Sequence, residues 1–165
     1  MMENRGQISA EFIFLTGVLI VIVMLSTIFI AGENELNLAM SAARNGVIEG
    51  VASSSAAMYA DEAYDDYSGL KGNLMHPYSV DIINISYSEL GEDDVYAKKK
   101  IQFKVYARPS DEYSEGELDS IGERINYNLR KSIAISFNST SSTNSLYNPV
   151  FSPHYVFTTA NIKWV

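Results

Sequence analysis

The stretch RGQISAEFIFLTGVLIVIVMLSTIFIAG, residues 5–32, is the strongest structural signal in this chain. From Phe12 to Ala31 it contains 20 consecutive residues without a charge. Twenty helical residues span about 30 Å, which is the thickness of the hydrocarbon core of a bilayer. The segment therefore predicts a membrane-inserted helix close to the N-terminus.

Glu11 stands at the edge of this run, where a carboxylate costs several kcal/mol unless it is paired. A secretory signal peptide would have a shorter apolar region, about 7–15 residues, followed by a small-x-small cleavage site. The sequence Phe29-Ile30-Ala31 matches that site poorly. A plain single-pass anchor fits the length of the run but gives Glu11 no role.

The residues in front of the run favour a third interpretation. Arg5-Gly6-Gln7-Ile8-Ser9-Ala10-Glu11-Phe12 resembles the leader and cleavage region of an archaeal type IV pilin precursor with a class III signal peptide. In that family a membrane aspartic peptidase removes a short polar leader before a Gln, ahead of the hydrophobic segment. The resemblance covers about residues 1–35. It implies a leader of residues 1–6, cleavage between Gly6 and Gln7, and a mature chain whose fifth residue is Glu11.

Cleavage before Gln7 would create an α-amino group, which is largely protonated below its pKa of about 8. Within one chain this amine lies one helical turn from Glu11 and could pair with it. The resemblance implies that the carboxylate meets the amine of a neighbouring subunit as helices leave the membrane and stack, which would also set their register. The alternative is a carboxylate that faces lipid headgroups or complements the N-terminal end of the helix dipole.

The resemblance implies a structural subunit of a surface filament that serves adhesion or attachment. Its partners would be other pilin subunits, through the N-terminal helix, a prepilin peptidase, and the membrane at the precursor stage. Arg5 precedes the span and Glu33 and Glu35 follow it, which favours a cytoplasmic N-terminus and an extracellular mature form. The competing hypothesis is a single-pass membrane-anchored extracellular binding protein that does not polymerise.

Residues 7–66 are expected to form the N-terminal helix, with 12–31 in the membrane or filament core. Beyond the span, mostly small residues recur at steps of three and four: Ala39, Met40, Ala43, Val47, Val51, Ser54 and Met58. This stripe predicts the face that packs on the chain's own domain, in preference to a second filament contact. Each glycine in a helix costs about 1 kcal/mol relative to Ala, so Gly46 and Gly50 predict bends or breaks.

Residues 67–165 predict an extracellular body, and the fold class is α+β. The long hydrophobic helix would pack on a small antiparallel sheet with one further amphipathic helix. Alternating apolar residues predict a hairpin of strands 79–87 and 95–107, joined by a loop at 89–94. Helical spacing over 115–132 predicts the second helix, followed by a short strand at 133–137. The C-terminal residues 155–165 have strand composition.

Two Asn-x-Ser/Thr sequons, at Asn84 and Asn138, are candidate N-glycosylation sites if they are exposed outside the cell. The acidic cluster of Asp61, Glu62, Asp65 and Asp66 has calcium-ligand chemistry but not the spacing of an EF-hand, so a solvated turn is the preferred interpretation.

The composition argues against several other functions. The net charge of −8 argues against a nucleic-acid partner. The chain has no cysteine, which excludes disulfides and thiolate metal sites. His76 and His154, its two histidines, belong to no catalytic motif. The expectation is therefore a non-enzyme without catalytic residues, cofactor or metal site.

Overall fold

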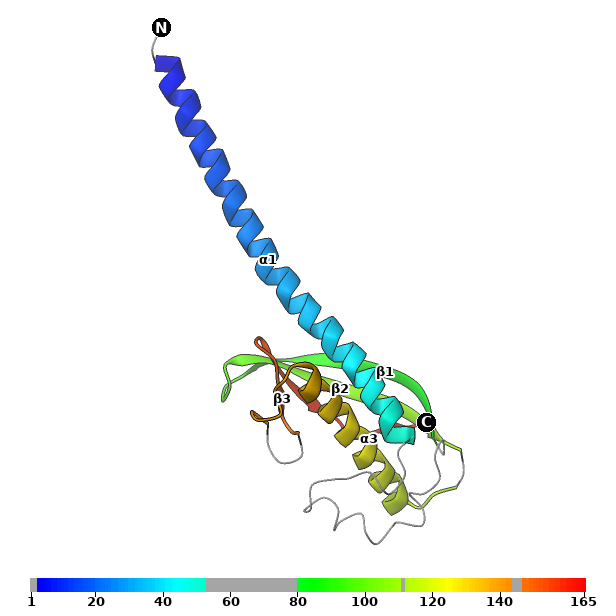
Figure 1. The fold of residues 1–165 in the computed structure, drawn as a ribbon. Helices are drawn as coiled ribbons and strands as arrows, with labels where there is room; N and C mark the ends of the chain where they lie inside the picture. The colour runs from blue at the N-terminus through cyan, green and yellow to red at the C-terminus, as the bar shows by residue number, and fades with distance from the viewer. Residues whose placement is uncertain (1–2, 53–79, 111, 144–146) are drawn as a thin grey trace. The chain divides into compact units, whose positions relative to one another are not determined.

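The computed structural model describes residues 3–52, 80–110, 112–143 and 147–165. The elements in chain order are α1 (Glu3–Ala52), β1 (Val80–Asp93), β2 (Lys98–Pro109), α3 (Glu115–Ser136), β3 (Val150–Phe151), β4 (Tyr155–Thr159) and β5 (Lys163–Trp164) (Figure 1). The chain divides into two compact units, residues 1–37 and 38–165. The predicted helix residues 53–66, including Ser54, Met58 and the acidic cluster, lie outside the described residues, as does His76.

The first unit is the N-terminal part of α1. Every side chain from Ala10 to Ile30 is exposed. Among the described residues one helix, Ala10–Ala52, is long and apolar enough by length and composition to cross a membrane. The predicted membrane-type helix is thus present, and it begins at Glu3, ahead of the expected start at Gln7.

The second unit contains a mixed sheet, which confirms the α+β fold class and corrects the expectation of a purely antiparallel sheet. The strand order is β1-β2-β4-β3, and β5 also pairs with β2. The pairs β1–β2 and β3–β4 are antiparallel, whereas β4 and β5 run parallel to β2. Parallel strands need a long crossover, and α3 lies in the connection between β2 and β4. Residues 155–165, which have strand composition, therefore form the two short strands β4 and β5. Both pair with β2 on the side opposite β1.

The core lies between the sheet and the helices. Alternate residues of β2, which are Ile101, Phe103, Val105 and Ala107, are buried, as the alternation predicted. One face of α3 is buried at helical spacing and supplies Ile121, Ile125, Leu129 and Ile133. The ring of Phe157 in β4 packs near those of Phe103 and Phe137, with ring centroids 6.0 and 5.7 Å away.

The C-terminal part of α1 packs against α3 through its small residues, and Figure 1 shows the two helices side by side. Ala39, Ala43 and Val47 are buried, which confirms that the stripe is a core face of the domain. Gly46 and Gly50 do not break α1, which is helical through both positions. A Cβ at Gly50 would lie 2.8 Å from Ile125 Cα, so glycine is required there for a close helix crossing.

The structure confirms the predicted hairpin, but the turn lies further along the chain than predicted. β1 continues to Asp93, so the expected loop at 89–94 is mostly strand and the turn occupies residues 94–97. Two ion pairs link the strands near the turn, Lys99–Glu89 at 3.5 Å and Lys100–Asp93 at 3.4 Å. Glu89 and Asp93, which lie in the segment predicted as a loop, are therefore cross-strand partners of lysines in β2.

The second helix is also longer than predicted, because α3 continues to Ser136 where a strand at 133–137 was expected. Ile133 and Ala134 extend its buried face by a further turn. After the C-cap Phe137, Ser139 N–H donates to Ala134 O at 2.8 Å and Asn138 N–H to Ile135 O at 3.0 Å. This is a Schellman ending, with Asn138 in the left-handed region at φ 51°.

Candidate processing and assembly segment

The predicted processing residues Gly6 and Gln7 and the predicted assembly residue Glu11 all lie in the first turns of α1. Positions 7 and 11 are four residues apart, a rise of about 6 Å along a helix axis. The backbone nitrogen of residue 7 and the side chain of residue 11 therefore lie on the same side of the helix, near its N-terminal end. Glu11 is exposed, at the start of the apolar segment.

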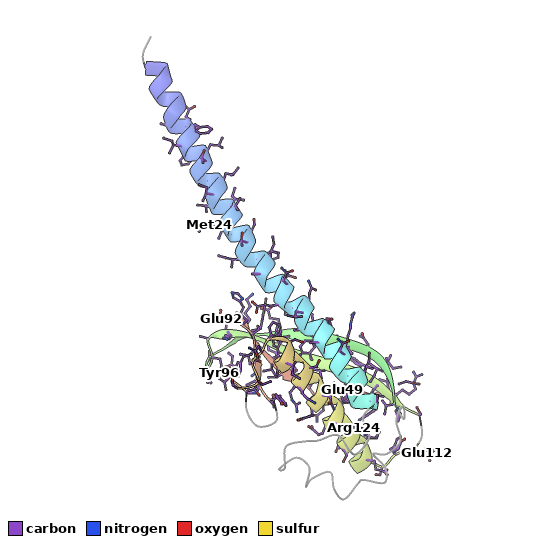
Figure 2. All side chains as sticks on the ribbon, in the orientation of Figure 1. Met24, Glu49, Glu92, Tyr96, Glu112 and Arg124 are labelled. Carbon is purple, nitrogen blue, oxygen red and sulfur yellow. The ribbon has the colours of Figure 1, made fainter. Side chains whose placement is uncertain are left out.

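The apolar segment of α1 presents large side chains on all sides, as Figure 2 shows around Met24. The exposed fractions of Phe14, Met24 and Phe29 are 74, 63 and 69 %. A contiguous apolar surface of this kind indicates a site of protein or membrane contact. The segment is suited to lipid or to the helices of other chains.

The polar side chains inside this segment satisfy their hydrogen bonds within the helix. The hydroxyls of Thr16, Ser26 and Thr27 donate to the carbonyl four residues earlier, at 2.8, 2.8 and 2.9 Å. In an apolar medium each hydroxyl would otherwise lose its water partners at a cost of several kcal/mol on a hydrocarbon scale. These residues are therefore compatible with burial in lipid or a helical core.

Gly17 forms a hollow on the surface of α1. A Cβ added there would meet nothing within 4 Å, and the hollow is lined by Phe14, Gly17, Val18, Val21 and Ile22. Small residues in apolar helices let a second helix approach closely. Sequence reasoning missed this hollow, which the apolar residues spaced around a lone glycine could have indicated.

The two sequons lie in different parts of the fold, one on a strand and one after a helix. Asn84 is exposed on the edge strand β1, beside a register irregularity between Ile82 and Asn84. Asn138 is exposed directly after α3, and Thr140 at the third sequon position is exposed as well. Both asparagines are thus accessible, which the sequence could not establish.

The remaining titratable groups form no catalytic constellation among the described residues. His154 is exposed in the turn before β4, and no group of three His, Cys, Asp or Glu suited to a metal occurs in the described part of the chain. Burial raises the pKa of Tyr127, and the neighbouring Tyr147 raises it further while Arg130 lowers it. For Asp93, desolvation raises the pKa but hydrogen bonds from Val95 N–H, Lys100 and Tyr96 N–H outweigh it and lower the pKa.

Sequence reasoning missed a set of polar residues on the buried face of α3. Arg124, Asn126, Asn128 and Arg130 have exposed fractions of 6 % or less. Arg130 Nη1 donates to Thr159 Oγ1 at 2.6 Å, and Asn126 Nδ2 donates to Ala160 O at 3.1 Å. These bonds attach α3 to the end of β4 and to the residue that follows it, and no helical periodicity of apolar residues could have revealed them.

Comparison with known families bears on the N-terminal segment. Residues 4–30 match the family model of the class III signal peptide, a structural and not an enzymatic family. This match indicates a type IV pilin-like precursor, anchored in a membrane by its apolar helix. No curated protein and no solved structure matches the chain.

Proposed function

We propose that this chain is a structural subunit of a type IV pilus-like surface filament of the archaeal kind, used for adhesion or surface attachment. The class III signal peptide at residues 4–30 carries the proposal. The exposed apolar helix supports it, because the same surface can be covered by lipid in the precursor and by neighbouring helices in a filament. The body would be extracellular and the N-terminus of the precursor cytoplasmic.

A prepilin peptidase would remove residues 1–6 by cleavage between Gly6 and Gln7. The new α-amino group of Gln7 would then pair with Glu11 of a neighbouring subunit. Each charge is costly in an apolar core when it is alone, and pairing offsets much of that cost while it fixes the register of the helices. Other pilin subunits, contacted through the helix, are therefore the proposed partners.

N-terminal sequencing and intact mass of the cell-associated protein test the cleavage. The expected mature chain begins at Gln7. A cell-associated chain that still carries Met1 would contradict the cleavage and favour a membrane-anchored binding protein that does not polymerise.

A charge-neutral substitution tests the pairing. Glu11→Gln should leave insertion and cleavage intact but abolish filaments, measured by electron microscopy and by the amount of subunit sheared from cells. Glu33→Gln, an exposed carboxylate further along the same helix, is the matched control and should assemble normally. Normal filaments from Glu11→Gln would show that the carboxylate has no assembly role.

We also propose that the exposed sequons carry glycan, Asn138 above all, because it sits at a helix end beside an exposed Thr140. Intact mass of the mature protein should exceed the polypeptide mass, and Asn138→Gln should remove one glycan increment. Asn84→Gln tests the second sequon in the same way. An unmodified mass in the native host would rule out modification at both sites.

A further inference from the structure

The outer face of the sheet, which points away from α3, carries many basic side chains. Successive residues of a strand point to opposite faces, and the buried residues of β2 point toward the helices. Trp164, which is in register with the buried Ala107, lies close to Gly122 of α3 and marks the same inner side. The residues between the buried ones therefore point outward. The cations of this outer face are Lys98, Lys100, Lys104, Arg108 and Lys163.

Two of these cations have partners within the body. Lys98 Nζ donates to Ser152 O at 2.6 Å, and Lys100 pairs with Asp93 at 3.4 Å. The other three make no ion pair with a residue that the structure describes. They form the cation patch, which consists of Lys104, Arg108 and Lys163.

The cation patch surrounds Tyr106. Lys104 and Arg108 stand two residues from it along β2, and Lys163 is in register with it on β5. Residues two apart on a strand are separated by about 7 Å, so the patch extends over about 13 Å. Asp81 is in register with Arg108, but the two side chains form no ion pair. Three like charges at this spacing repel one another, and a partner that brings carboxylates would remove the repulsion.

An acidic ridge of similar length lies on α3 and consists of Glu115, Asp119 and Glu123. All three side chains are exposed, and none makes an ion pair with a described residue. Residues four apart share one side of a helix, and like charges there lower helix stability. At a rise of 1.5 Å per residue the ridge extends over about 12 Å, which is close to the length of the cation patch.

The acidic ridge and the cation patch lie on opposite sides of the sheet, because α3 packs against its buried face. One chain therefore cannot bring its own ridge onto its own patch, whereas a second copy can. A contact between two different surfaces is heterologous, and its repetition yields a ring or an open helical array. A filament requires contacts of this kind.

We propose that the cation patch of one body binds the acidic ridge of a second copy, so that neighbouring bodies are joined by a network of charge pairs. The inference rests on the proposed filament function and adds a contact between bodies to the contact between N-terminal helices. A single exposed ion pair contributes little, but several charges in one network contribute more. Added salt should weaken the contact.

Cysteine crosslinking tests the contact, since the chain has no cysteine of its own. Ser88→Cys places a thiol on the outer face, in register with Gln102. Gly116→Cys places a thiol beside the acidic ridge, where a Cβ meets nothing within 4 Å. The full chain with both cysteines is treated with a bismaleimide in cell membranes and in material sheared from cells. It should give a ladder of trimers and larger species, whereas each single-cysteine chain can give at most dimers.

Charge reversal in the double-cysteine chain distinguishes a charge-paired contact from proximity alone. Lys104→Glu/Lys163→Glu should reduce the ladder about tenfold, because it sets acids against acids. Asp119→Lys/Glu123→Lys should have the same effect for the opposite reason. The four reversals together should restore the ladder, and a misfolded body could not show this restoration.

The matched control is Arg44→Glu/Lys131→Glu, which changes the net charge as much as the patch variant but lies outside the patch and the ridge. It should keep the ladder, and a monofunctional maleimide should label all variants equally. The absence of a ladder from the double-cysteine chain, a ladder unaffected by either reversal, or a ladder that the four reversals fail to restore would each overturn the proposal. An unaffected ladder together with weaker attachment of the patch variant to an anionic surface would assign the patch to an anionic polymer instead.

Filament yield separates this inference from the proposed function. Filaments whose subunits begin at Gln7 but give no ladder would retain the filament function and reject the contact between bodies. A charge-dependent ladder in the membranes of cells without filaments would retain the contact and reject the filament function.

Discussion

Gly46 in α1 lies directly against the backbone of Asn128 in α3. A Cβ at Gly46 would overlap the carbonyl oxygen of Asn128 and lie 2.7 Å from Leu129 Cα. Backbone cannot move aside as a flexible side chain can, so the crossing of these two helices requires glycine at this position. Within the second unit, the C-terminal part of α1 is thereby fixed against α3.

Gly46→Ala should destabilise the body, although alanine is the better helix former by about 1 kcal/mol. The added methyl forces the helices apart, and overpacking of this kind costs about 1–3 kcal/mol. The measurement is the urea midpoint of the full chain in detergent. Gly116→Ala is the control, because a Cβ there meets nothing within 4 Å, and it should be neutral or slightly stabilising.

Filling the hollow at Gly17 should affect assembly and not folding. Gly17→Ile should leave the urea midpoint of the body unchanged, because nothing lies within 4 Å of the new Cβ. If the hollow receives a neighbouring helix, the amount of filament sheared from cells should fall severalfold. Val23→Leu adds bulk on another side of the same helix and serves as control, and equal filament yields from both variants would remove the hollow from the interface.

The start of α3 depends on a capping box. Ser114 Oγ accepts from Glu117 N–H at 3.4 Å, and Glu117 Oε2 accepts from Ser114 N–H at 2.6 Å. Ser114→Ala should therefore lower the free energy of unfolding by about 1 kcal/mol. Ser120→Ala removes a hydroxyl that only donates to Gly116 O within the helix, and it should change the stability by much less.

Acid should loosen the hairpin turn. The pKa of Asp93 is lowered in the fold, so its carboxylate stabilises the turn above the pKa of an unfolded aspartate, about 3.9. This contribution is lost as the pH falls through the lower folded value. The amide resonances of Val95 and Tyr96, which donate to Asp93 Oδ1 at 3.0 and 3.3 Å, should titrate below pH 3.9. Asp93→Asn should abolish that titration, and its persistence would assign the effect to another carboxyl.

Alkali should weaken the packing at Tyr127. Burial raises the pKa of this phenol, with a further increase from Tyr147, so the fold favours the neutral form. Its contribution to stability is complete below the unfolded tyrosine pKa of about 10 and is lost as the pH rises through the higher folded value. Tyr127→Phe should make stability less dependent on pH above 10, measured by urea unfolding. An identical pH dependence in both proteins would contradict this assignment.

Local sequence patterns were sufficient to predict the helix of the first unit, the alternating buried residues of β2 and the buried face of α3. Each depends on residues close in sequence, because a 20-residue uncharged run or a period of two or 3.6 residues allows few structures. The N-terminal motif around Gln7 and Glu11 is equally local, and the class III signal peptide match covers it.

Packing between segments distant in sequence determined the features that local patterns did not predict. The parallel pairing of β4 with β2, the position of the hairpin turn and the glycine crossing at Gly46 all depend on strand register or on contacts between residues far apart in sequence. The cation patch likewise includes Lys163 only because β5 pairs with β2. Such contacts are set by which surfaces exclude water together and by which backbone groups find partners, and neither is encoded in a local pattern.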